Sequence, residues 1–131
     1  PTCYDQWFPE LSRIYGLKNT EVLIYPTAIG AEPTAPEVDT QASWQKVMVA
    51  QGIMSNAFII AVNRIGTEDG LTFYGSSFIS SPMGEILASA PRSEPAVLVV
   101  ELDFNQRELW GRLFPFASQR QPQTYNRLLQ A

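Results

Sequence analysis

Three short runs of apolar and β-branched residues constrain the fold of this chain more than any other feature. They occupy residues 21–25, 58–62 and 96–102. Each run has the length of a strand rather than that of a helix. Between the first two runs, residues 40–56 carry a stripe of large apolar side chains at helical spacing, formed by Trp44, Val47, Met48 and Met54. Short strands that alternate with amphipathic helices predict a layered α/β (α+β) domain.

The remaining segments predict a first helix, a long loop, a group of short strands and a last helix. Residues 5–17 are expected to form the first helix, with Pro9 suited to its first turn. Residues 26–39 contain three prolines and one glycine, which predicts a loop. Residues 71–90 are expected to form short strands around a turn, and Asn105 is placed to cap the final helix.

The length and charge of the chain limit its partners. The 131 residues fit one domain of ordinary size, and we predict a single domain over residues 1–131. The net charge is −4, and Lys and Arg form no cluster. A nucleic-acid partner would demand a basic stripe, so we predict none. No run approaches the roughly 20 apolar residues of a membrane span, so we predict no membrane partner either.

The chain contains one cysteine and no histidine. Without histidine there is no Cys-His or Ser-His pair, and acid–base chemistry must use Asp, Glu, Lys or Tyr. One cysteine alone also cannot build a usual zinc site, so we predict neither a metal nor another cofactor. Because a single cysteine cannot form an internal disulfide, we expect a reducing, cytoplasmic compartment.

The position of Cys3 suggests nucleophilic chemistry. A lone cysteine is commonly a small buried apolar side chain, and that explanation stays open. Cys3, however, directly precedes the first predicted helix, where backbone N–H groups and the helix dipole favour a thiolate. The N–H of Tyr4 is placed to donate to an oxyanion. Asp5 can either orient this segment or cap the helix.

Several motifs along the chain resemble those of nitrilase-superfamily carbon–nitrogen hydrolases. Residues 3–10 have Cys, an aromatic residue and Asp, and then Phe-Pro-Glu, which is similar to the nucleophile motif of that superfamily. The other matching segments follow in order at residues 21–30, 63–68, 72–79 and 82–85, and at Arg120, Pro122 and Tyr125. The resemblance is greatest to N-carbamoylputrescine amidohydrolases, with β-ureidopropionase-like enzymes next.

This resemblance implies part of a four-layer αββα sandwich that is incomplete at its amino-terminal side. Residues 1–131 would then be the carboxy-terminal portion of the hydrolase domain. The resemblance also implies hydrolysis of an amide or ureido C–N bond in a small molecule, with Cys3 as nucleophile and the Tyr4 N–H as oxyanion donor. In the family a Glu base and a Lys precede the Cys, whereas only Pro1 and Thr2 precede it here. Whether this chain alone is an enzyme therefore stays open.

The resemblance also indicates which residues would contact substrate: Thr27, Ala28, Ile29 and Glu68. The first three lie where the family has its substrate loop, and the fourth lies near the pocket wall. A structural role is the alternative for each of them, and Glu68 can equally be a surface charge.

Four further polar residues have competing explanations. Asn63 and Arg64 are expected to tie the end of a strand to a neighbouring loop. Glu32 and Glu37 lie on the long loop, where their carboxylates can attract an amine or simply form a solvated acidic surface.

Two non-catalytic functions are alternatives to hydrolysis. Half of a two-sheet sandwich would expose apolar faces and strand edges, which favour association. We therefore predict a homo-oligomer, and one alternative is a self-associating remnant of the hydrolase fold without catalysis. The other alternative is a binding module that keeps the pocket for a small molecule without its chemistry.

Overall fold

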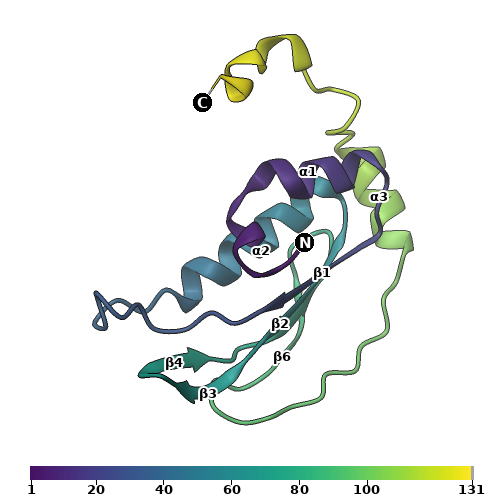
Figure 1. Ribbon diagram of the computed structural model, residues 1–131. Helices are drawn as coiled ribbons and strands as arrows, with labels where there is room; N and C mark the ends of the chain where they lie inside the picture. Colours follow the sequence, from purple (N-terminus) through teal and green to yellow (C-terminus); the bar gives the residue numbers. More distant parts are fainter. Residues whose placement is uncertain (131) are drawn as a thin grey trace.

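The computed structural model describes residues 1–130 and contains a four-stranded sheet with helices packed on one face (Figure 1). The α-helices are α1 (Pro9–Leu17), α2 (Gln41–Ser55) and α3 (Asn105–Leu113). The 3-10 helices are η1 (Cys3–Trp7), η2 (Pro122–Thr124) and η3 (Asn126–Leu129). The strands are β1 (Val22–Thr27), β2 (Phe58–Asn63), β3 (Ile65–Glu68), β4 (Leu71–Tyr74), β5 (Phe78–Ser80) and β6 (Ile86–Ser89). The α/β class predicted from the sequence is confirmed.

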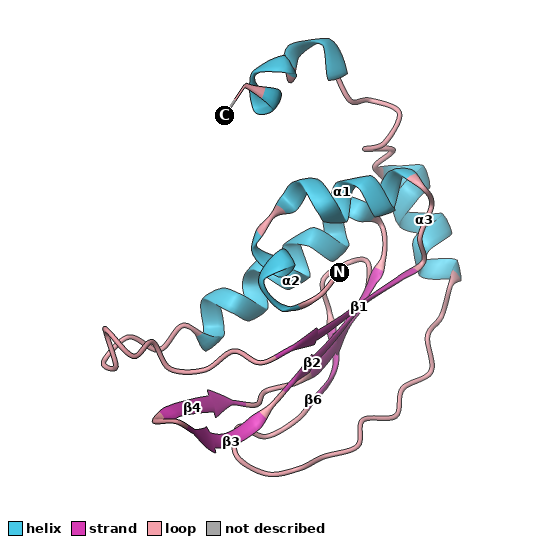
Figure 2. Ribbon diagram, viewed as in Figure 1, coloured by secondary structure: helices cyan, strands magenta, loops and turns pink. Residues whose placement is uncertain are grey.

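The sheet is mixed and has the strand order β1-β2-β5-β6. β1 and β2 are parallel, and the chain connects them by crossing over through α2. β5 and β6 then continue the sheet in antiparallel pairing, while β3 and β4 form a separate hairpin. Figure 2 shows α1 and α2 lying on the same side of the strands. This arrangement leaves the ends of β1 and β2 next to each other, where the candidate site is found.

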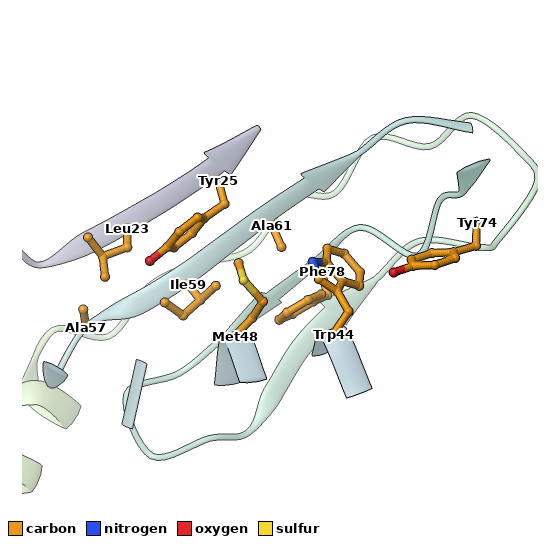
Figure 3. Packing of buried hydrophobic residues seen from close by; sticks show 9 residues of the cluster. All are labelled: Leu23, Tyr25, Trp44, Met48, Ala57, Ile59, Ala61, Tyr74 and Phe78. Carbon is orange, nitrogen blue, oxygen red and sulfur yellow. The ribbon is translucent and has the colours of Figure 1, made fainter. Parts of the chain in front are cut away.

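The core lies between the sheet and α2. Alternate residues of β1 and β2 point to this face, as the period of two in a strand requires. Trp44 packs edge-on against Phe78, with ring centroids 5.5 Å apart. Figure 3 shows how the buried cluster gathers, and its members are Leu23, Tyr25, Trp44, Met48, Ala57, Ile59, Ala61, Tyr74 and Phe78.

The opposite face of the sheet is apolar and partly open. Ile24 of β1 is 53% exposed and Val62 of β2 is 49% exposed. The nearly continuous apolar runs of these strands predicted burial on both faces. Within residues 1–130 this face is covered only in part, since Phe58 is buried against Phe104 with ring centroids 5.5 Å apart, whereas no layer covers Ile24 and Val62. Burial on both faces is therefore realised only in part. The described chain therefore forms two layers, one of helices and one of sheet.

The strand predicted at residues 96–102 is wrong, because this segment joins no sheet in the described part of the chain (Figure 1). Residues 93–102 form no backbone hydrogen bond to any other residue of the range 1–130. Val97 and Val99 are each 90% exposed. A strand needs a neighbouring edge to bond with, so β propensity alone does not produce one. The segment ends at α3, which Arg107 anchors by donating to the Asn56 carbonyl at 2.8 Å.

The predicted helix over residues 5–17 divides into η1 and α1. Phe8 lies between them in an extended conformation. Proline disfavours the helical conformation in the residue before it, and Pro9 then begins α1 as expected. The break allows η1 to turn away from the axis of α1. This turn determines where Cys3 lies.

The second helix begins where the sequence predicts it, but its cap differs. Thr40 occupies the N-cap position of α2 and makes no side-chain capping hydrogen bond. Asp39 supplies that contact instead, because its carboxylate accepts from the N–H of Gln41 at 3.1 Å. Asp39 also pairs with Arg92, so the start of α2 is tied to the segment that follows β6.

Truncation of the core at Phe78 tests the packing of α2 against the sheet. Phe78→Ala removes a fully buried ring beside Trp44, and we expect a loss of about 3–5 kcal/mol in the free energy of unfolding. Urea denaturation followed by far-UV circular dichroism measures this loss. Val38→Ala on the long loop is the control and should change the free energy by no more than about 0.5 kcal/mol. Equal losses in the two variants would contradict the packing described here.

Candidate active site

Cys3 is the first residue of η1 and is partly buried. Its φ angle is +46°, which is unusual for a residue other than glycine and costs free energy. The turn is closed locally by Asp5, whose carboxylate accepts from the N–H of Thr2 at 2.9 Å. Thr2 is the N-cap residue of η1, so this contact caps that helix and at the same time stabilises the turn around Cys3. Both roles expected for Asp5 therefore meet in one hydrogen bond.

A cavity of about 210 Å³ opens beside Cys3. Residues of η1 form one wall, and the loop that follows β1 forms another. Tyr4, Ala28 and Ile29 were predicted as site residues, and the structure brings all three to this cavity. The complete lining consists of Cys3, Tyr4, Gln6, Trp7, Ala28, Ile29, Gly30, Ala31, Glu32, Pro33 and Leu71.

The surroundings of Cys3 favour the thiolate form. The backbone N–H of Ala28 does most to lower the pKa of the Cys3 thiol, and the Thr27 hydroxyl and the Tyr4 N–H act in the same direction. Partial burial and the carboxylate of Asp5 oppose this change, and the pKa lies below its ordinary value on balance. The Thr27 hydroxyl is buried and has no hydrogen-bond partner among residues 1–130. Cys3 is therefore suited to nucleophilic attack.

Asn63 holds the loop that carries Ala28 and Ile29. Its side-chain oxygen accepts from the Ile29 N–H at 3.0 Å, and its amide nitrogen donates to the Ile29 carbonyl at 3.0 Å. The same amide nitrogen donates to the carbonyl of Gly75 at 2.8 Å. The expectation that Asn63 ties a strand end to the neighbouring loop is confirmed.

Gly30 allows the loop to approach β4 closely. A Cβ atom at this position would lie 2.1 Å from the carbonyl oxygen of Thr72, which no side chain can tolerate. The N–H of Ala31 donates to that same oxygen at 2.9 Å. The loop is thus fixed on one side by Asn63 and on the other by β4.

The structure does not bring Glu68 to the cavity beside Cys3. Glu68 lies at the end of β3 and is paired with Arg64 on the exposed hairpin. The guanidinium of Arg64 also lies over the ring of Phe73, 4.6 Å from its centroid. A contact of Glu68 with substrate stays a prediction, whereas its place in this ion pair is a structural fact.

Sequence reasoning missed several residues of the cavity wall. Gln6, Trp7 and Leu71 carry no chemical signature that distinguishes a cavity wall from a core, so only the structure identifies them. Glu32 was identified from the sequence, because a carboxylate on the long loop can attract the amine of a substrate. Glu32 lines the cavity, and Glu37 does not.

The described residues hold neither a cluster suited to a metal ion nor a helix suited to a membrane. Residues 1–130 contain no group of three or more His, Cys, Asp or Glu side chains arranged to hold a metal ion. Within the same range, no helix combines the length and the apolar character needed to cross a membrane.

A partly buried cysteine with a lowered pKa, set beside a small cavity, agrees with the motifs found in the sequence. The family model for carbon–nitrogen hydrolases matches residues 2–112. The chain therefore belongs to the carbon–nitrogen hydrolase family, and the resemblance to the nitrilase superfamily is confirmed.

The curated relatives of the chain include a citrullinase and an N-carbamoylputrescine amidase. It is 41% identical to a citrullinase of Francisella tularensis subsp. tularensis, over 97% of this chain and 46% of the relative. It is also 41% identical to an N-carbamoylputrescine amidase of Arabidopsis thaliana, over 97% of this chain and 45% of the relative. The chain thus spans about half the length of the curated relatives it matches.

A solved structure supports the fold. The carbon–nitrogen hydrolase of Helicobacter pylori G27 superposes with a TM-score of 0.90 at 39% sequence identity. The alignment covers 98% of this chain and 47% of that protein. The mixed α/β architecture described above is therefore a partial hydrolase fold that corresponds to about half of the complete one.

Replacing the Thr27 hydroxyl tests its effect on Cys3. Thr27→Val keeps the shape of the side chain but removes the hydroxyl that lowers the pKa of the thiol, so we expect this pKa to rise. Only the thiolate is alkylated rapidly, so the rate of reaction with iodoacetamide at pH 7 should fall, by less than the roughly tenfold that one pKa unit implies. Mass spectrometry across a range of pH measures the rate.

Thr124→Val is the matched control, because its hydroxyl bonds within η2. Its alkylation profile should equal that of the unaltered chain. A profile of Thr27→Val that also coincides with the unaltered chain would show that the hydroxyl does not act on Cys3.

Proposed function

We propose that this chain provides the nucleophile of a hydrolase that cleaves an amide or ureido C–N bond in a small molecule. The observation that carries the proposal is the Cys3 sulfur at a cavity, with backbone N–H groups that favour its thiolate. The thiolate would attack the substrate carbonyl, and the N–H of Tyr4 would donate to the resulting oxyanion. The leaving nitrogen takes up a proton and departs as the amine or as ammonia. An amide substrate then leaves a thioester on the sulfur, a ureido substrate leaves a thiocarbamate, and water hydrolyses either one.

The proposal assigns the acid–base groups to the part of the fold that this chain does not cover. Neither lysine nor histidine lines the cavity in the described residues. In the nitrilase superfamily a Glu base and a Lys lie on the amino-terminal side of the cysteine, and the relatives of this chain are about twice as long as the region matched. Catalysis by this proposal needs both parts together.

The proposed substrate class is a ureido compound similar to N-carbamoylputrescine. The names of the two relatives refer to citrulline and N-carbamoylputrescine, and both compounds contain a ureido group. In this chain the Glu32 carboxylate at the cavity is a suitable partner for the amine of such a substrate. Contacts with substrate are proposed for Thr27, Ala28, Ile29 and Glu68. A single unpaired cysteine further supports a reducing, cytoplasmic setting.

Reconstitution tests the proposed reaction. The chain would be co-expressed with the part of the Arabidopsis relative that lies on the amino-terminal side of its matched region. We expect release of ammonia from N-carbamoylputrescine by the complex, and release at the level of a protein-free blank from Cys3→Ala.

The control for reconstitution is Ser118→Ala, which alters an exposed side chain of the tail and should leave release unchanged. A folded complex that releases no ammonia, or one in which Cys3→Ala has no effect, would contradict the proposed function.

A second candidate function is a non-catalytic module that associates with itself. The observations that favour it are the open apolar face of the sheet and the extended segment over residues 96–102. Both surfaces expose groups that a second copy can cover, the first by apolar packing and the second by strand pairing. On this proposal the homo-oligomer forms through these surfaces.

Self-association is tested by light scattering at micromolar concentration. We expect a dimer or a larger species, because pairing would bury Val97 and Val99 and satisfy the free backbone groups beside them. The double change Val97→Lys and Val99→Lys should shift the distribution toward monomer, since it would place two charges at that contact. Val38→Lys on the long loop is the control and should change nothing. A monodisperse monomer of the unaltered chain would contradict this function.

A further inference from the structure

A buried network of hydrogen bonds lies beneath the turn that carries Cys3. The indole N–H of Trp44 donates to the side-chain oxygen of Gln6 at 2.8 Å. The side-chain amide of Gln51 donates to the backbone carbonyl of Gln6, and the Tyr25 hydroxyl donates to the side-chain oxygen of Gln51 at 3.0 Å. Gln6 is 1% exposed and Gln51 is 2% exposed, so water does not compete for these groups.

The network joins three elements of the fold. Gln6 belongs to η1, Tyr25 to β1, and Trp44 and Gln51 to α2. The carboxamide of Gln51 bonds both to η1 and to β1, because its nitrogen donates to one and its oxygen accepts from the other. One side chain therefore bridges these two elements.

This bridge matters because the surroundings of Cys3 come from the same two elements. The sulfur belongs to η1, whereas the Thr27 hydroxyl and the Ala28 N–H lie at the end of β1. Gln6 is three residues after Cys3, and Tyr25 is two residues before Thr27. A shift of η1 relative to β1 would separate the sulfur from both donors.

The conformation of Cys3 also requires support from outside the turn. A non-glycine residue with a positive φ persists only where the surrounding structure holds it. The contact of Asp5 with Thr2 lies within the turn and at its exposed side. The contacts of Gln6 are the buried ones, and they attach the turn to the core.

We propose that Gln51 and Gln6 are positioning residues for the Cys3 thiol, with Tyr25 and Trp44 as their buried partners. Gln51 holds η1 against the end of β1, so that the sulfur stays beside the Ala28 N–H and the Thr27 hydroxyl. This inference rests on the proposed role of Cys3 as a nucleophile, and it concerns residues that do not touch the substrate themselves.

The titratable groups near the sulfur are few. Asp5 and Tyr4 lie on η1, Glu32 lies on the loop after β1, and Tyr25 lies in the network below. Burial raises the pKa of Tyr25 to about 12, so its hydroxyl keeps its proton and donates throughout the neutral range. A change in the titration of Cys3 below pH 9 is therefore not caused by Tyr25.

The test measures the pH profile of alkylation of Cys3 by iodoacetamide in this chain. Cys3 is the single cysteine, so mass spectrometry reports this thiol alone. Gln51→Met keeps the length of the side chain but removes both hydrogen bonds. Tyr25→Phe removes one of them and preserves the packing of the ring. We expect the midpoint to move to higher pH in both variants, and more in Gln51→Met, with a several-fold slower reaction at pH 7.

Ser55→Ala is the matched control, because it removes another buried hydrogen bond of α2, the one that Ser55 donates to the carbonyl of Ser12 in α1. It should lower stability without moving the midpoint. A midpoint that moves equally in Ser55→Ala would overturn the proposal, since the effect would then follow from stability alone.

Unchanged midpoints in both network variants would also overturn the proposal, provided that circular dichroism shows them folded. If Gln51→Met does not fold, the proposal is tested by Tyr25→Phe alone: a midpoint moved to higher pH supports it, and an unchanged midpoint overturns it. Alkylation requires no substrate and no second polypeptide, so a failure of ammonia release in the reconstituted complex is a separate result. Such a failure would refute the proposed function and leave the positioning role as measured.

Discussion

The parallel pairing of β1 with β2 is the interaction on which the rest of the structure depends. Parallel neighbours cannot be joined by a tight turn, so the chain crosses over through α2 and lays this helix across one face of the sheet. The crossover brings Trp44 and Gln51 to the underside of η1. The register of the pair sets Thr27 opposite Asn63, so the loop that follows β1 begins where Asn63 can hold it. The surroundings of Cys3 thus follow from one strand pairing.

Much of this structure could be predicted from the sequence because local patterns decide it. The apolar runs identify β1 and β2, Pro9 marks the start of α1, and the motif around Cys3 marks the turn that carries the proposed nucleophile. The segment over residues 96–102 could not be predicted, because a strand is a property of two partners and its sequence describes only one. Burial on a single face of the sheet was missed for the same reason.

The candidate site shows a similar division. Cys3, Ala28 and Ile29 meet at one cavity as the motifs indicate, whereas the roles of Gln6 and Gln51 are invisible in the sequence. A glutamine side chain is usually exposed to solvent, and no sequence spacing predicts that its carboxamide will be buried between two elements. Glu68 illustrates the opposite case, since a residue of a family motif takes part in an exposed ion pair with Arg64. Every residue except proline carries a backbone N–H, so residue type alone does not show which N–H groups take part in the chemistry.

The bare face of the sheet, with Ile24 and Val62 half exposed, has a thermodynamic consequence. Covering an apolar face is favourable near room temperature mainly because the released water gains entropy. It also lowers the heat capacity of the system. Any assembly through this face is therefore weakened by cooling and strengthened by moderate warming. The temperature at which this chain is handled would then determine which form of it is present, as much as its concentration does.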